Sequence, residues 1–390
     1  MTTPATTEIA VVGGGIVGLA LAHALAQRGR QVTVVEGARV GERAAAGVAA
    51  GMLAPSSEVD LSDPRLTDLA LAAHAMYGTW SAALTAETGI DTGYDATGTL
   101  LVALHADHLA ILQHLYDFQV ERGLPAERLS AKAARDEEPY LAPGLAGALR
   151  MPDAQVDPRR LLRALPIALE RRGATLIEGA HVTAIAPIEG TGYEITIDRE
   201  GAASTLRATQ VVVTAGAWSR QIASPILGMP VVPLPMRPVK GQILRLRGER
   251  IIQHVVRTPD VYLVPRADGE LVIGASMEDV GFDERSRAGA VHDLLREARR
   301  AVPGIAELDL AECGVGFRPA LRDHLPAIGA VDGAGLFVAT GHFRNGVELA
   351  PITARLLTDL ICDGRLDPLL EPFAPGRFAP AAPNVAEAAR

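Results

Sequence analysis

Residues 8–37, EIAVVGGGIVGLALAHALAQRGRQVTVVEG, decide the fold class of this chain. Glu8–Val12 is a short apolar run, rich in valine and isoleucine, that predicts a strand. Ile16–Arg28 is apolar on all sides, which is typical of a helix buried against a sheet, and Gly29 ends it. Gln31–Glu36 predicts a second strand. A strand, a helix and a second strand in this order favour an α/β fold with a parallel sheet.

The turn between the first strand and the helix carries the pattern G-x-G-x-x-G, formed by Gly13, Gly15 and Gly18. Gly13 permits the tight turn, Gly15 lets the backbone approach a diphosphate, and Gly18 lets the helix lie close to the strand. The helix N-terminus offers free N–H groups to the phosphates. Glu36 ends the second strand, where its carboxylate can accept hydrogen bonds from an adenosine ribose and would repel the 2′-phosphate of NADP. The segment predicts a dinucleotide site, with FAD and NAD both open; the alternative is a glycine-rich turn in an unrelated α/β fold.

The composition is that of an ordinary globular protein, and 390 residues suffice for two domains or one large one. The net charge is −9 and there is no basic block, which argues against nucleic acid as a partner. Cys313 and Cys362 give no disulfide framework, and neither they nor the ten histidines show metal-ligand spacing, so we predict no metal site and a cytoplasmic protein. The apolar run Ile9–Ala26 follows Glu8, lacks a basic leader and contains the glycine pattern, so we expect no membrane segment.

The remaining chain alternates between helical and strand patterns. Residues 43–55, RAAAGVAAGMLAP, are small and apolar and predict a loop whose backbone approaches another group. Asp157 and Pro158 predict the start of a helix. Helices are expected at 64–90, 105–122, 158–173, 284–302 and 345–362, and strands within 91–104 and 236–276 and at 174–178, 181–188, 192–199, 205–208, 210–214 and 336–340. The strands at 210–214 and 336–340 are predicted to return to the first sheet. An uninterrupted NAD domain does not need such strands, whereas a flavin domain interrupted by a substrate domain does.

Ten motifs lie in one order between residue 8 and about residue 362: VVGGGIVGLALAHALA, AAGML, VDPRRLL, VVVTAGAWS, PVKGQ, YLVPR, VIGASM, GFRP, LPAIG and GHFRNGVELAP. This ordered set resembles the D-amino-acid-oxidase-like family of FAD enzymes and, within it, is most similar to the glycine oxidases of thiamine biosynthesis. The resemblance implies a Rossmann-like FAD-binding domain (1–90, 150–235 and 315–370) interleaved with an α+β substrate domain built on an antiparallel sheet (91–149 and 236–314), and a C-terminal tail (371–390). It also implies non-covalent FAD, because Cys313 and Cys362 fall outside the segments that match flavin attachment sites.

The resemblance also assigns residues to the cofactor. They are Gly13, Gly15, Ile16, Val17, Gly18, Glu36, Gly37, Ala45, Ala46, Ala50, Gly51, Met52, Val182, Gly216, Gly341, His342, Phe343, Arg344, Asn345, Gly346, Val347 and Glu348. Ile16 and Val17 match positions over the diphosphate, and Val182 matches a backbone contact to adenine. Residues 342–348 match the segment that wraps the pyrimidine edge of the flavin.

Three side chains match the substrate site of the family. Arg318 matches the arginine that binds the substrate carboxylate, Tyr262 a tyrosine that assists it, and Arg344 a second arginine near the substrate. The alternatives are a solvated surface arginine, a core tyrosine and a structural ion pair with a neighbouring carboxylate. Met277 and Met52 either line the pocket or belong to the core.

Two acidic residues depart from the family pattern. Glu348 stands where relatives carry an apolar residue; a carboxylate there suits a helix N-terminus but not a reduced flavin, so we expect it to point to solvent. Asp260 places a second acid near the expected pocket and leaves the identity of the substrate open. Lys240 in PVKGQ is expected to be a solvated strand lysine.

The resemblance implies oxidative deamination of glycine, sarcosine or small D-amino acids, with hydride transfer from Cα to flavin N5. O₂ would be reduced to H₂O₂, and the products would be an oxoacid and ammonia or an amine, supplying thiamine biosynthesis. An alternative is a D-amino-acid or hydroxyproline dehydrogenase that passes electrons to a quinone or another acceptor. An NAD-dependent dehydrogenase and a non-catalytic flavoprotein or RNA-modifying relative are further alternatives. The expected partners are a small amino-acid or amine substrate and an electron acceptor; a homo-oligomer is left open.

Overall fold

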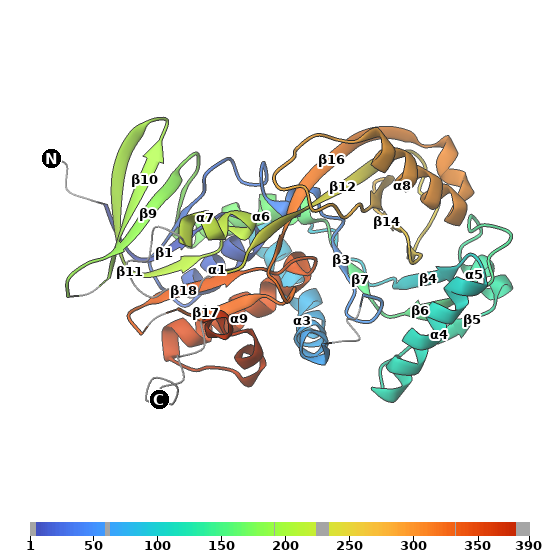
Figure 1. Cartoon of the computed structure of the whole chain (residues 1–390), viewed down its shortest axis with the longest axis horizontal. Coiled ribbons are helices and arrows are strands. Elements are labelled where there is room, and N and C mark those ends of the chain that lie inside the picture. The colour runs from blue at the N-terminus through green and yellow to red at the C-terminus, as the bar shows by residue number, and fades with distance from the viewer. Residues whose placement is uncertain (1–4, 59–62, 191, 224–233, 332, 380–390) are drawn as a thin grey trace, which may run out of the picture.

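The computed structural model describes residues 5–58, 63–190, 192–223, 234–331 and 333–379. Two large β-sheets lie next to each other along the long axis of the molecule, and helices cover both (Figure 1). The predicted α/β class is confirmed.

The first sheet is mainly parallel. Its order is β17 (Ala327–Ala330), β18 (Leu336–Thr340), β11 (Ala202–Val213), β1 (Ala5–Val12), β2 (Val32–Val35) and β8 (Thr175–Ile177), with β10 (Tyr193–Arg199) and β9 (His181–Pro187) joined to the first half of β11. β11 pairs in parallel with β1, and β18 pairs in parallel with β11. The prediction that two distant strands return to the first sheet is therefore confirmed.

One strand prediction in this sheet is wrong in detail. Residues 205–208 and 210–214 were expected as separate strands, but Ala202–Val213 is one strand. Thr209 is exposed, so a polar residue at this position does not interrupt it. The first half of the strand pairs with β10 through a two-residue turn, in which Glu200 and Gly201 both have positive φ, as such a hairpin requires.

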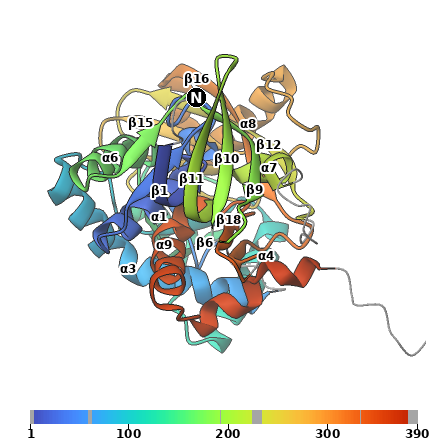
Figure 2. The ribbon, with the colours of Figure 1, turned by 90° about the vertical axis from the view of Figure 1, so that its left-hand side faces the viewer.

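Helices cover one face of the first sheet, and the β9–β10 hairpin covers part of the other. The helices are α1 (Ile16–Gln27), α3 (Pro64–Thr88), α6 (Pro158–Arg171) and α9 (Gly346–Asp363). Ile9 and Val11 of β1 lie in the core beneath these helices, while Ala10 and Val12 lie in the core on the hairpin side. Figure 2 shows β9, β10 and β11 in front, with α1, α3 and α9 gathered to one side of them.

The second sheet is mostly antiparallel, as predicted. Its order is β16 (Asp309–Ala320), β12 (Arg237–Arg247), β15 (Glu270–Gly274), β14 (Tyr262–Pro265), β13 (Val255–Arg257), β4 (Thr99–Ala103), β6 (Gly147–Met151) and β5 (Glu127–Leu129). β13 and β4 form its parallel pair. Three helices lie against this sheet: α4 (Ala106–Glu121), α5 (Ala131–Glu137) and α8 (Ala288–Ala301). The domain boundaries given above stay a prediction.

Several short elements differ from expectation. The predicted loop 43–55 contains a helical turn, α2 (Ala45–Val48), and a strand, β3 (Met52–Leu53), which pairs with β7 (Ala154–Gln155). This turn of helix packs closely against Gly41, because a Cβ on Gly47 would collide with the Gly41 carbonyl oxygen. The remaining short elements are α7 (Ser219–Ala223) and 3₁₀ turns at Gly216–Trp218, Pro303–Glu307, Pro368–Phe373 and Pro375–Phe378.

The helix start at Asp157 is as predicted, since its carboxylate accepts a hydrogen bond from Arg159 N at 2.9 Å. In the predicted tail, Phe373 is fully buried, and residues 380–390 lie outside the described residues. The apolar run Ile9–Ala26 is shared between β1 and α1. Among the helices that the structure describes, none combines the length and hydropathy of a membrane span.

Candidate active site

A cavity of about 620 Å³ is lined from both sheets, within the usual range of ligand and cofactor sites, roughly 300–1,000 Å³. The predicted residues that line it are Gly13, Gly15, Ile16, Val17, Glu36, Gly37, Ala45, Ala46, Ala50, Gly51, Met52, Val182, Gly216, Tyr262, Arg318, His342, Phe343, Arg344, Gly346 and Val347. Gly18, Gly341, Asn345 and Glu348, also assigned to the cofactor, are not lining residues. The fold thus brings residues from distant parts of the sequence to one cavity, and their individual roles stay predictions.

The three glycines of the first turn have different surroundings. A Cβ on Gly13 would stand 2.7 Å from the carbonyl oxygen of Thr214, and a Cβ on Gly18 would stand 2.5 Å from its hydroxyl, so packing alone requires both glycines. A Cβ on Gly15 would have no atom within 4 Å and would stand in the cavity. Protein packing does not account for Gly15, whereas a group bound close to the backbone would.

The start of α1 is open to the cavity. Gly15 is the N-cap and supplies no side-chain cap, and no acidic side chain lies in the first turn. Ile16 and Val17 line the cavity at this point. Backbone N–H groups and the positive end of the helix dipole are therefore available to an anion, as a dinucleotide diphosphate requires.

Glu36 lines the cavity at the end of β2. Its carboxylate accepts hydrogen bonds from Gly14 N at 2.6 Å and Ala38 N at 3.0 Å. These bonds fix the carboxylate while each oxygen keeps further acceptor capacity. A ribose at this position would find an oriented acceptor.

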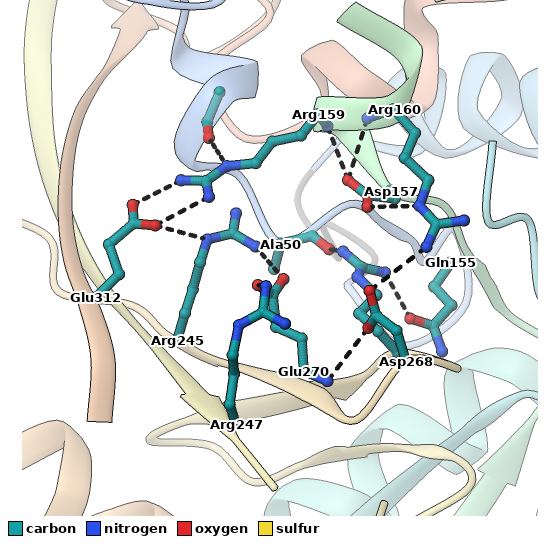
Figure 3. Close-up of polar contacts among 12 residues, drawn as sticks. Ala50, Gln155, Asp157, Arg159, Arg160, Arg245, Arg247, Asp268, Glu270 and Glu312 are labelled. Carbon is teal, nitrogen blue, oxygen red and sulfur yellow. Dashed lines mark hydrogen bonds and ion pairs between the residues drawn. The ribbon is translucent and has the colours of Figure 1, made fainter. Parts of the chain in front are cut away.

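The segment 45–52 lines the cavity and is held from two sides by arginines that sequence reasoning did not single out (Figure 3). Arg159 of α6 donates to Gly47 O at 2.7 Å and forms a two-bond ion pair with Glu312 of β16, at 2.6 and 2.9 Å. Arg266 donates to Ala50 O and, at 2.7 Å, to Gln155. The sequence signal that could have indicated Arg159 is the arginine pair in VDPRRLL, directly after the helix cap.

The same network continues through the second sheet. Arg245 of β12 is buried and forms ion pairs with Glu270 and Glu312 on the two neighbouring strands (Figure 3). Burial lowers the pKa of Arg266 to about 10, so its guanidinium remains charged at neutral pH. The network thus links α6, the segment 45–52 and the second sheet.

Arg318 and Tyr262 each lie over a glycine of a neighbouring strand. A Cβ on Gly241 would stand 2.7 Å from Cζ of Arg318, and a Cβ on Gly274 would stand 2.6 Å from Cε2 of Tyr262. Nη1 of Arg318 donates to Ser276 O at 3.0 Å, which fixes one edge of the guanidinium. Burial raises the pKa of the Tyr262 hydroxyl, so this hydroxyl keeps its proton and can donate a hydrogen bond.

Arg344 has a carboxylate partner that the sequence did not reveal. Its Nη2 lies 2.5 Å from Oε1 of Glu58, and Nη2 of Arg257 lies 3.5 Å from the same oxygen. Burial opposes ionisation of Glu58, but the positive charges of Arg257, Arg344 and Arg318 outweigh it and lower the pKa of the carboxyl. The structural ion pair considered as an alternative for Arg344 is thus present, and Arg344 still lines the cavity.

The expectation that Glu348 points to solvent is wrong. Glu348 is 3% exposed, in the first turn of α9, and its Oε2 accepts a hydrogen bond from Asn345 at 3.0 Å. Burial raises the pKa of this carboxyl to about 8, so it is mainly protonated at neutral pH. A neutral carboxyl avoids placing a negative charge beside the part of the cavity wall that the start of α9 forms.

The expectation that Lys240 is solvated is also wrong. Its side chain is fully buried, its Nζ donates to Arg285 O at 2.7 Å and lies 3.5 Å from Asp283, and it does not line the cavity. His342 is buried as well; its Nε2 lies 3.2 Å from the Thr353 hydroxyl, and burial lowers its pKa to about 4. His342 therefore carries no charge at neutral pH.

The methionines lie at the edge of the cavity. Met52 is half-buried and Met277 is 60% exposed, and both line it. Neither Cys313 nor Cys362 is a lining residue. Within the described ranges, no group of three or more His, Cys, Asp or Glu side chains is arranged to hold a metal ion.

Comparison with known proteins gives consistent results. A family profile described as "FAD dependent oxidoreductase" matches residues 8–360. The "Bifunctional protein ThiO/ThiG" of Nostoc sp. is 35% identical over 383 residues, which are 94% of this chain and 54% of that protein. The chain therefore spans about half the length of this relative.

Two further similarities extend over whole chains. The glycine oxidase of Geobacillus kaustophilus is 35% identical over 359 residues, covering 91% of this chain and 92% of the relative. A crystal structure of glycine oxidase from Geobacillus kaustophilus superposes with a TM-score of 0.88 at 34% identity, covering 95% of this chain and 98% of the other.

Proposed function

We infer the reaction from the family: this chain belongs to the FAD dependent oxidoreductases, and FAD is its cofactor. We propose that it is an amino acid oxidase acting on glycine, sarcosine or small D-amino acids, with O₂ as the electron acceptor. The observation that carries the proposal is the position of Arg318 and Tyr262. Both side chains lie over glycines of neighbouring strands, and both line the same cavity as the glycine turn before α1. In this proposal the one cavity holds both the dinucleotide and the substrate carboxylate.

The residues of the cavity fit FAD. The open position at Gly15 and the uncapped start of α1 would hold the diphosphate, and Glu36 would accept hydrogen bonds from the ribose. The segments 45–52 and 342–347 would surround the flavin. When bound, FAD supplies the acceptor for the hydride that leaves Cα of the substrate.

The side chains of the second sheet would orient the substrate. Arg318 presents a planar fork that can bind both oxygens of a carboxylate, and Tyr262, protonated at neutral pH, can donate a further hydrogen bond. Fixing the carboxylate fixes the direction of the Cα–H bond. The positive charges of Arg257, Arg318 and Arg344 would lower the pKa of the substrate amine and so favour its neutral form, which is the form that can be oxidised.

The products would be an oxoacid and ammonia or an amine, together with H₂O₂. We place the reaction in the cytoplasm and in thiamine biosynthesis because of the similarity to the glycine oxidases and to the ThiO/ThiG protein. The division into an FAD domain and a substrate domain belongs to the same proposal, and the two sheets support it.

The test is spectroscopic. The purified protein should be yellow, and anaerobic addition of glycine, sarcosine, D-alanine or D-proline should bleach the flavin bands. Release of H₂O₂ in air would identify the oxidase, whereas bleaching without peroxide would identify a dehydrogenase. A yellow protein that no amine bleaches would contradict the proposed substrate class.

A further inference from the structure

Three arginines meet at one end of the cavity around a single buried carboxylate. Arg257, Arg318 and Arg344 all line the cavity together with Glu58, whose side chain is 11% exposed. Arg257 and Arg344 approach the same oxygen of Glu58, at 3.5 and 2.5 Å. This end of the cavity therefore holds more guanidinium groups than one substrate carboxylate needs.

The charges at this end do not balance. Glu58 is ionised, because the three guanidinium groups lower the pKa of its carboxyl despite its burial. Asp260 also lines the cavity, but its side chain is 48% exposed and lies 3.3 Å from His108, so solvent screens it. With one substrate carboxylate on Arg318, one of the three positive charges would still lack a partner. The side chain of Arg344 is 35% exposed and solvent partly screens its charge, but that of Arg257 is only 18% exposed. Buried charges in proteins are normally paired.

The position of Arg257 separates it from the carboxylate clamp. Arg257 on β13 is paired directly with Tyr262 on β14, so the two side chains stand on the same face of the sheet. Nη1 of Arg257 donates to Ser57 O, which fixes the guanidinium at the cavity wall. Nη2 lies 3.5 Å from Glu58, so Arg257 is held in the cavity wall next to Tyr262, where a group extending from the substrate beyond Tyr262 would meet its charge.

We propose that Arg257, with Arg344, binds a second anionic group of the substrate, so that the preferred substrates are small amino acids carrying a second carboxylate. This inference rests on the proposed function, since it concerns the same cavity. The competing role for Arg257 is structural: it would only tie the segment Ser57–Glu58 to β13. The two roles differ in whether Arg257 distinguishes dianions from monoanions.

A binding experiment separates the two roles without catalysis. Isothermal titration of the purified flavoprotein with malonate and with acetate compares a dicarboxylate with a monocarboxylate. We expect malonate to bind at least tenfold more tightly than acetate, and the Arg257→Gln variant to reduce this ratio to threefold or less. The Arg207→Gln variant is the matched control, because it removes a half-exposed arginine of β11 that does not line the cavity, and it should keep the ratio.

A kinetic experiment tests the same inference on the reaction. We expect kcat/KM for iminodiacetate, a glycine with an N-carboxymethyl group, to exceed that for sarcosine at least tenfold. In Arg257→Gln this preference should fall at least tenfold, mainly through KM, whereas a purely structural role would change both substrates equally. If the wild type and Arg257→Gln preferred iminodiacetate over sarcosine by the same factor, the inference would be overturned. Malonate binding no more tightly than acetate would overturn it too. Failure of every amine to bleach the flavin would instead reject the proposed function.

Discussion

The guanidinium of Arg318 lies over the backbone of Gly241, on the neighbouring strand of the second sheet. A Cβ at position 241 would stand 2.7 Å from Cζ of the arginine, closer than non-bonded atoms can approach. The glycine of PVKGQ therefore makes room for the arginine of GFRP, and both belong to the proposed carboxylate site.

The Gly241→Ala variant should displace Arg318 while keeping its charge. We expect KM for the amino-acid substrate to rise at least tenfold, because a small misplacement of a bidentate donor loses much of its binding energy. Steady-state kinetics and flavin content measure the effect. Gly289→Ala is the control, since a Cβ there meets no atom within 4 Å. A Gly241→Ala enzyme with unchanged KM would show that Arg318 is not used in this position.

Removing the arginine itself should have a larger effect. We expect Arg318→Ala to raise KM by 10²-fold or more, since truncating one partner of a buried charge pair costs about 2–5 kcal/mol. Arg318→Lys should recover only part of the loss, because an ammonium group cannot form the two parallel hydrogen bonds of a guanidinium. Wild-type kinetics in Arg318→Ala would remove this residue from the site.

Gly15 and Gly18 should respond differently to substitution. Gly15→Val should fold, because a Cβ meets no protein atom within 4 Å, but its side chain would occupy the proposed diphosphate position. We expect the affinity for FAD to fall at least tenfold, measured as flavin absorbance per polypeptide, with an unchanged far-ultraviolet circular dichroism spectrum. Gly18→Val should lose folded protein, because its Cβ would collide with the Gly13 carbonyl oxygen and the Thr214 hydroxyl. A fully yellow Gly15→Val protein would contradict the proposed cofactor position.

Glu348 should make the stability of the protein depend on pH. Its pKa rises from 4.5 to about 8 on burial, so the folded chain binds more protons than the unfolded chain between these values. The free energy of unfolding should therefore fall as the pH rises, by on the order of 3 kcal/mol at pH 7.

The Glu348→Gln variant should remove this dependence. Denaturant unfolding at pH 4.5 and pH 8 should show that the variant gains stability over the wild type mainly at the higher pH. Glu121→Gln, at an exposed position of α4, should match the wild type at both values. A difference between Glu348→Gln and the wild type that does not grow with pH would show that Glu348 is ionised in the folded protein.

Local sequence signals predicted much of the fold. The glycine turn, the buried helix after it and the cap at Asp157 were predictable because each depends on residues a few positions apart. The returning strands were predictable because they are continuous apolar runs. The division of β11 was predicted wrongly because Thr209 lies at an exposed position of an otherwise regular strand.

The surroundings of single charged side chains could not be predicted in the same way. Glu58 and Arg344 are 286 positions apart, and Arg159 and Glu312 are 153 apart, so no short pattern indicates either pair. The burial of Lys240 depends on the segment around Asp283, beyond a strand hairpin. The solvated position predicted for Glu348 was wrong, because its spacing from the helix start suits both a solvated and a buried carboxyl.

The position of β18 and the start of α9 in the cavity wall sets an order of events during synthesis. The glycine turn of α1 leaves the ribosome first, but the residues opposite it in the cavity, from Ala339 to Val347, are made only near the end. Until then the edge of β11 that pairs with β18 is unpaired, and it can mispair with strands of other chains. We therefore expect capture of the cofactor to be a late step in maturation, and chains that stop before Leu336 to be colourless and to aggregate.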